Sequence, residues 1–101
     1  HATVYDADSG RALGLLRDLS ADGLMIAGDQ LLRVGREYRL RIDLPITVCG
    51  EQTLRTRSTV VWSRPAHLGY CHAGLSARGL DDGQACVLAT LIDEYELRFA
   101  E

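Results

Sequence analysis

The segment 17–26 carries the residues best suited to binding chemistry. A carboxylate, a hydroxyl and a glycine lie at Asp18, Ser20 and Gly23, between two apolar runs. A carboxylate accepts hydrogen bonds from a matched pair of N–H donors, such as those on the edge of a guanine base, and a hydroxyl donates or accepts beside it. A glycine permits a sharp turn and the close approach of a ligand. The same three residues also make an ordinary turn, because Asp and Ser side chains bond nearby backbone N–H groups.

Other residues with chemical potential show no functional spacing. We find no Gly-rich phosphate loop, no Ser–His–Asp set and no metal-binding cluster, and we expect neither an enzyme nor a metal or cofactor site. Cys49, Cys71 and Cys86 are odd in number and lack Cys-x-x-Cys spacing. They predict free thiols in a reducing cytosol rather than a disulfide or a zinc site.

Composition predicts one globular domain spanning residues 1–101. The chain is 47% hydrophobic and 25% charged, and no apolar run approaches the roughly 20 residues of a membrane span. The net charge of −3 argues against DNA or RNA as a partner, because nucleic-acid binding requires a basic surface. All 11 basic residues are arginine, and a few well-placed arginines suffice for a small dianionic ligand.

Extended segments separated by turns account for the first three quarters of the chain. The clearest alternation lies in 35–44, where apolar and charged residues fall on opposite faces, and Pro45 is expected to end this strand. The expected strands are 2–6, 13–18, 24–26, 35–44, 52–62 and 69–75, of which the first two form a hairpin.

Two of these strands carry arginines on their outward faces. These residues would form a cross-strand basic patch or four separate solvated charges. Trp62 is expected on the inner face with Leu54 and Val60, as a core or barrel-rim residue, although an indole could also stack a base. The outward arginines are Arg39, Arg41, Arg55 and Arg57.

The C-terminal segment predicts one amphipathic helix over 81–97. Asp81 is a candidate cap, and Gln84, three residues later, would complete a capping box. Six short strands followed by one helix indicate a mainly β fold, a six-stranded antiparallel barrel with a C-terminal α-helix, because closure removes exposed sheet edges. Apolar residues recur at helical spacing at Leu88, Leu91, Ile92, Tyr95 and Phe99.

The Asp-x-Ser-x-x-Gly pattern at Asp18, Ser20 and Gly23, together with the order of elements, resembles the PilZ domain family over essentially the whole chain. The resemblance implies a bacterial, cytoplasmic signalling module that binds the second messenger cyclic di-GMP and relays its presence to a protein partner. In that family this loop contacts a guanine of the ligand. Asp18 and Ser20 would then be ligand contacts, Gly23 would shape the loop, and the adjacent Arg17 is a further candidate.

The second motif of that family is an Arg-x-x-x-Arg segment before the first strand, which folds over the ligand. The sequence contains no such spacing, and its first residue is His1. We expect the arginine segment to lie upstream, since it would sit where this sequence begins. The alternative is a degenerate PilZ-like adaptor that binds proteins without the nucleotide, and a third hypothesis is a structural barrel of unrelated ancestry.

Overall fold

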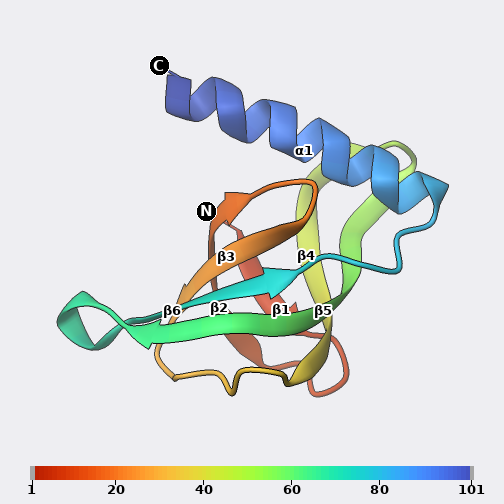
Figure 1. Cartoon of the computed structure of the whole chain (residues 1–101). Coiled ribbons are helices and arrows are strands. Elements are labelled where there is room, and N and C mark those ends of the chain that lie inside the picture. The colour runs from red at the N-terminus through yellow and green to blue at the C-terminus, as the bar shows by residue number, and fades with distance from the viewer. Residues whose placement is uncertain (1, 101) are drawn as a thin grey trace.

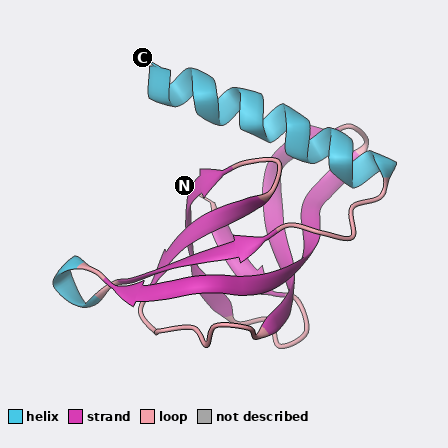
Figure 2. Cartoon of the chain, viewed as in Figure 1, coloured by secondary structure: helices cyan, strands magenta, loops and turns pink. Residues whose placement is uncertain are grey.

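The computed structural model shows six antiparallel strands closed into a barrel, with one long helix running across its end (Figures 1 and 2). The structure describes residues 2–100, with side chains for 2–94. The strand order around the barrel is β1-β2-β3-β6-β5-β4, which confirms the predicted fold class. The elements are β1 Thr3–Asp6, β2 Ala12–Leu19, β3 Gly23–Gly28, β4 Glu37–Val48, β5 Glu51–Pro65, the 3₁₀ turn η1 His67–Gly69, β6 Cys71–Ser76 and α1 Asp82–Ala100.

Alternation along the strands supplies the core. In β4, Tyr38, Leu40 and Ile42 are buried, whereas the charged residues between them face outward, as the sequence predicts. Equivalent inward positions of the other strands complete one continuous apolar cluster inside the barrel. Burial of this cluster drives closure, and it leaves the outer wall free to carry polar and charged groups.

The strand containing Pro45 is longer than predicted. Asp43 pairs with Thr53, and the next pair is Val48 with Glu51, so the register shifts between them. Pro45 lies in the irregular stretch, where its missing N–H removes no ladder hydrogen bond. The proline is therefore accommodated within β4 instead of ending it.

Gln84 joins the helix to the barrel. Its backbone N–H donates to Asp81 Oδ1 at 2.8 Å, which confirms Asp81 as the helix cap. The predicted return bond of the capping box is wrong, because the buried Gln84 side chain is used elsewhere. Its Nε2 donates to the carbonyl of Thr53 at 3.0 Å, and its Oε1 accepts from the backbone N–H of Arg55.

Packing of α1 continues with Val87 and Leu88, which are buried in the main core. Leu91 and Ile92 are half-buried against it. The helix ends at Ala100 rather than at the predicted residue 97. The predicted apolar positions Tyr95 and Phe99 lie outside the described side chains.

A disulfide between Cys49 and Cys86 fastens the β4–β5 turn to the first part of α1. The prediction of free thiols is therefore wrong for these two residues and right only for Cys71, which is free and half-buried. Neither bridged cysteine is part of a motif, and they lie 37 residues apart, so sequence spacing gives no signal for the pairing. The β4–β5 hairpin and the capped helix bring them together.

We predict that the double variant Cys49→Ser/Cys86→Ser has a free energy of unfolding lower by about 2–4 kcal/mol, because the bond closes a long loop in the unfolded chain. Denaturant unfolding without reductant measures this, with Cys71→Ser as the control. Identical transition midpoints for the double variant and the parent protein would show that the bond contributes nothing to stability.

Candidate functional site

An extra residue in β2 turns Asp18 to the outside of the barrel. Leu16 pairs with Ile26 and Asp18 pairs with Met25, so two residues of β2 oppose one residue of β3. Leu16 and Leu19 are both buried although they are three residues apart. With strict alternation, Asp18 would share the inner face with Leu16; the bulge places it outside, opposite Met25.

A second bulge does the same for Trp62 in β5. Val60 pairs with Leu75 and Trp62 pairs with Gly74, so one residue is again inserted. Val60 and Leu75 point into the core, whereas Trp62 lines an outer cleft. The predicted inward position of Trp62 is wrong for this reason, because a one-residue insertion moves every following side chain to the opposite face.

Gly74 leaves the space in which the indole of Trp62 packs. A Cβ atom at this position would collide with Nε1, Cε2 and Cδ1 of Trp62. The five-membered ring of the indole therefore lies directly against bare backbone of β6. No other residue type fits there without moving Trp62.

The two bulges lie at the same level of the barrel. Pairing runs from Asp18 to Met25, from Met25 to Gly74 and from Gly74 to Trp62, across β2, β3, β6 and β5. Around this row lies a cleft of about 350 Å³. Its lining residues are Asp18, Ser20, Asp22, Gly23, Leu24, Met25, Val61, Trp62, Gly74, Leu75 and Ser76. Three of the four predicted ligand residues, Asp18, Ser20 and Gly23, are thus brought together with an aromatic ring.

Local hydrogen bonds occupy some of the donor and acceptor groups of Asp18 and Ser20 in the predicted turn. Asp18 Oδ1 accepts from the N–H of Leu19 at 2.9 Å, and Ser20 Oγ donates to the carbonyl of Gly23 at 3.3 Å. Both side chains remain exposed. Within residues 2–94 no hydrogen bond reaches Asp18 Oδ2, and Ser20 Oγ keeps its acceptor lone pairs. The turn therefore has its own internal bonding and retains acceptors directed at solvent.

Gly23 is required for strand packing rather than for a sharp turn. It is the first residue of β3 and does not adopt a positive φ. A Cβ at Gly23 would collide with the carbonyl oxygen of Leu75, so only glycine allows this close approach of β3 and β6. Gly23 thereby sets the floor of the cleft.

Two arginines lie near the row, one exposed to solvent and one in contact with the Trp62 ring. Arg17, the fourth predicted residue, is exposed at the β2 bulge and does not line the cleft. Arg64 was not predicted, and its Cζ lies 4.9 Å from the centroid of a Trp62 ring, in a cation–π contact. The sequence does indicate this contact, because Trp62 and Arg64 are two residues apart on a strand and therefore share a face.

Comparison with known proteins identifies the family. The family model described as PilZ domain matches residues 1–94. The chain belongs to the PilZ domain family. No curated protein and no solved structure gives a match.

PilZ domains are binding and adaptor modules, and as a family they are receptors for cyclic di-GMP. The described part of this PilZ domain contains no helix long and apolar enough to cross a membrane. It also contains no group of three or more His, Cys, Asp or Glu side chains placed to hold a metal ion. The outer cleft presents a carboxylate, a hydroxyl, an indole and glycine backbone.

We predict that Gly74→Ala displaces the indole of Trp62, because the added methyl group occupies the space of its five-membered ring. Trp62 is the single tryptophan of the chain, so intrinsic fluorescence reports its surroundings directly. The emission should shift to the red. Gly83→Ala is the control, since its Cβ would crowd only the movable end of the Glu51 side chain and would lie at ordinary contact distance, 3.5 Å, from Asp81 Oδ1. Unchanged emission in Gly74→Ala would contradict the seating of the ring on Gly74.

Proposed function

We propose that this PilZ domain binds cyclic di-GMP in the outer cleft between Asp18 and Trp62 and relays the binding to a protein partner. The observation that carries the proposal is the shared level of the two bulges, which place a carboxylate and an indole on one outer row. Without the bulges both groups would face the apolar interior. A structural barrel of unrelated ancestry is no longer an alternative, given the family match.

The chemistry of the row suits the two bases of the ligand. Asp18 would accept the ring N–H and the exocyclic amine of a guanine, with Ser20 at the neighbouring edge. The Trp62 ring would stack a base, a contact worth about 1–3 kcal/mol in nucleic-acid-binding proteins. Three strand spacings of about 4.8 Å separate β2 from β5, so the row is about 14 Å long when it is followed along the curved wall of the barrel. A ligand with two purines spans this row better than a mononucleotide.

Arginines would hold the phosphates. Arg64 lies over the indole, and a stacking base would displace it toward the phosphates or the O6/N7 edge of guanine. An arginine segment upstream of His1 would add to this grip and become ordered over the ligand. Binding shifts the population toward that ordered state only through the higher affinity of the ligand for it.

A receptor of this kind would act in the bacterial cytoplasm, where an intracellular messenger is present. Disulfides are rare in that compartment, so the Cys49–Cys86 bond would be unusual there. The alternative function is a protein-interaction adaptor without the nucleotide. The local hydrogen bonds of Asp18 and Ser20 favour it, because they give both residues a role in the turn itself.

We predict that Asp18→Ala, Ser20→Ala and Trp62→Ala in the full-length protein each weaken cyclic di-GMP binding by about 1–3 kcal/mol, or roughly 5- to 150-fold. Isothermal titration calorimetry measures the affinities, and quenching of Trp62 fluorescence reports occupancy of the cleft. Asp29→Ala is the control, since Asp29 is an exposed carboxylate outside the cleft. GMP should bind far more weakly than the dinucleotide.

Two results would count against this function. If the full-length protein shows no binding heat with cyclic di-GMP, the adaptor is favoured. If Asp18→Ala, Ser20→Ala and Trp62→Ala all bind as tightly as the parent protein, the ligand lies elsewhere on the domain.

A further inference from the structure

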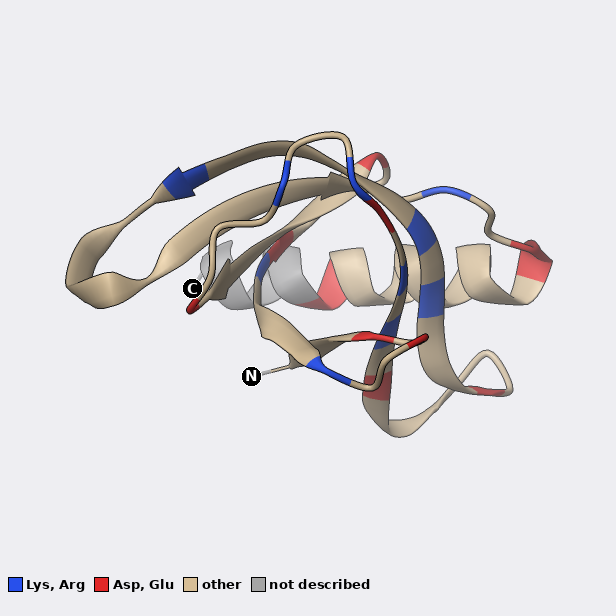
Figure 3. Cartoon of the chain, turned by 90° about the horizontal axis from the view of Figure 1, so that it is seen from below, with Lys and Arg blue, Asp and Glu red and all other residues tan. Residues whose placement is uncertain are grey.

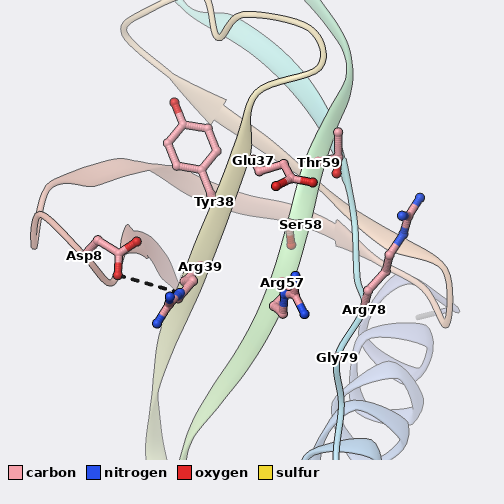
Figure 4. A pocket seen from close by; sticks show the side chains of 9 residues that line it. All are labelled: Asp8, Glu37, Tyr38, Arg39, Arg57, Ser58, Thr59, Arg78 and Gly79. Carbon is pink, nitrogen blue, oxygen red and sulfur yellow. Dashed lines mark ion pairs between the residues drawn. The ribbon is translucent and has the colours of Figure 1, made fainter.

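Three arginines lie side by side on the outer wall of the barrel. They lie outside the cleft that Asp18 and Trp62 line, which we call the Trp62 cleft. Arg39 of β4 pairs directly with Arg57 of β5. Arg57 in turn bridges to Arg78, which follows β6, through two reciprocal backbone hydrogen bonds of 2.8 Å. Figure 3 shows arginines on neighbouring strands of this wall, and Figure 4 shows the three side chains in one row. The cross-strand basic patch, left open by the sequence, is therefore present and extends to a third segment.

This row carries little compensating charge. Side chains directly opposite each other have Cβ atoms about 5 Å apart, and like charges in that position are destabilising. Arg39 Nε lies 4.0 Å from Asp8 Oδ1, but the two side chains are 76% and 67% exposed, so the pair is weak. Among residues 2–94 no ion pair reaches Arg57 or Arg78. Arg57 and Arg78 are thus two adjacent cations without an ion pair in the described part of the chain.

Arg41, also on the outward face of β4, differs in this respect. Arg41 lies over the ring of Tyr5, with its Cζ 4.6 Å from the centroid, and its Nε is 3.1 Å from Asp43 Oδ1. Arg41 therefore lies between an aromatic ring and a carboxylate, although its Nε makes no hydrogen bond within residues 2–94. The availability of Arg57 and Arg78 is a property of their row, not of every arginine on the barrel.

A cleft of about 860 Å³, which we call the arginine cleft, opens over this row. A Cβ at Gly79 would lie 2.9 Å from Arg57 Cδ, so the stem of Arg57 lies closely over Gly79. Figure 4 shows Glu37 and Thr59 toward the opposite end of the cleft from Arg57 and Gly79. The site has cationic groups at one end, and the Glu37 carboxylate and the Thr59 hydroxyl at the other.

The turn that carries Asp8 is held by Asp6. Asp6 accepts hydrogen bonds from Ser9 Oγ at 2.9 Å and from the N–H of Asp8 at 3.0 Å. Burial works to raise the pKa of Asp6, but the hydrogen bonds from Ser9 and Asp8 outweigh it, and the pKa is lowered from 3.8. Asp6 is thus ionised at neutral pH, and the turn beside Arg39 keeps its shape.

The arginine cleft is adjacent to the Trp62 cleft but separate from it. Thr59 lines the first and Ser76 lines the second, and the N–H of Thr59 donates to Ser76 Oγ at 2.9 Å. This contact forms the boundary between them. The two clefts share no lining residue.

We propose that the arginine cleft is a second binding site, for a compact polyanion with two or more adjacent phosphate groups. Guanidinium forks match phosphate oxygens bidentately, and phosphates joined by a bridging oxygen are close enough to be shared by cations on neighbouring strands. An acidic peptide fits less well, because carboxylates on one face of an extended chain repeat about every 6.8 Å.

The test uses Arg57→Gln, Arg78→Gln and the double variant, with inorganic tripolyphosphate as the probe at constant ionic strength. Calorimetry should show binding to the parent protein and a loss of about tenfold or more for each arginine removed. Thermal unfolding adds a second readout. Without the probe, the double variant should melt at the same temperature as the parent or higher, because cross-strand repulsion is relieved. With the probe, only the parent should be stabilised strongly.

Arg33→Gln is the matched control, because it removes the same charge from an exposed position outside the cleft. An equal loss of tripolyphosphate binding in Arg33→Gln and in Arg57→Gln would overturn the proposal in favour of general charge attraction. Tighter binding of hexaglutamate than of tripolyphosphate would overturn it in favour of an acidic protein partner.

Trp62→Ala separates this site from the proposed cyclic di-GMP site. It should keep tripolyphosphate binding and lose cyclic di-GMP, whereas the Arg57/Arg78 double variant should show the reverse pattern. Loss of tripolyphosphate binding in Trp62→Ala, with retention in the double variant, would place the polyanion in the Trp62 cleft and refute a second site.

Discussion

Two inserted residues, one in β2 and one in β5, determine what this barrel presents to solvent. In a closed barrel each strand is hydrogen-bonded on both sides, so its inward and outward positions cannot be changed by sliding one strand. A local bulge is the remaining way to reverse them. Without the bulges Asp18 and Trp62 would point inward with Leu16 and Val60, and burial of an unpaired carboxylate would oppose folding. The outer cleft and the intact core therefore depend on the same two irregularities.

The attachment of the helix leaves that wall accessible. Gln84 bonds to backbone groups of β5, and the Cys49–Cys86 disulfide holds the β4–β5 turn. Both contacts belong to the first part of α1, which lies across the end of the barrel (Figure 1). None of the residues that line the cleft belongs to α1. The helix thus closes the core from one end. The row from β2 to β5 stays open to a ligand or a partner.

The sequence predicts most of the fold but only part of the site. Strict alternation in 35–44 and the Asp81 cap are local patterns, and both appear in the structure. Bulges leave no local pattern, because they are defined by which residue a strand faces, and the inward assignment of Trp62 failed for that reason. The disulfide joins two cysteines 37 residues apart, and local spacing does not predict that pairing either. Hydrophobic periodicity does not show which distant segments pair, and both the bulges and the disulfide depend on such pairing.

The placement of charge, more than its sum, decides which ligands this wall attracts. The chain carries a net charge of −3, yet at physiological salt the Debye length is about 8 Å, so a ligand near the surface responds mainly to nearby groups. Arg64 over the indole and Arg57 in the neighbouring cleft are those groups. Because Thr59 of one cleft is hydrogen-bonded to Ser76 of the other, an anion bound in one cleft would lower the positive potential in the other. Such competition is electrostatic, and added salt weakens it, whereas steric overlap would persist at any salt concentration.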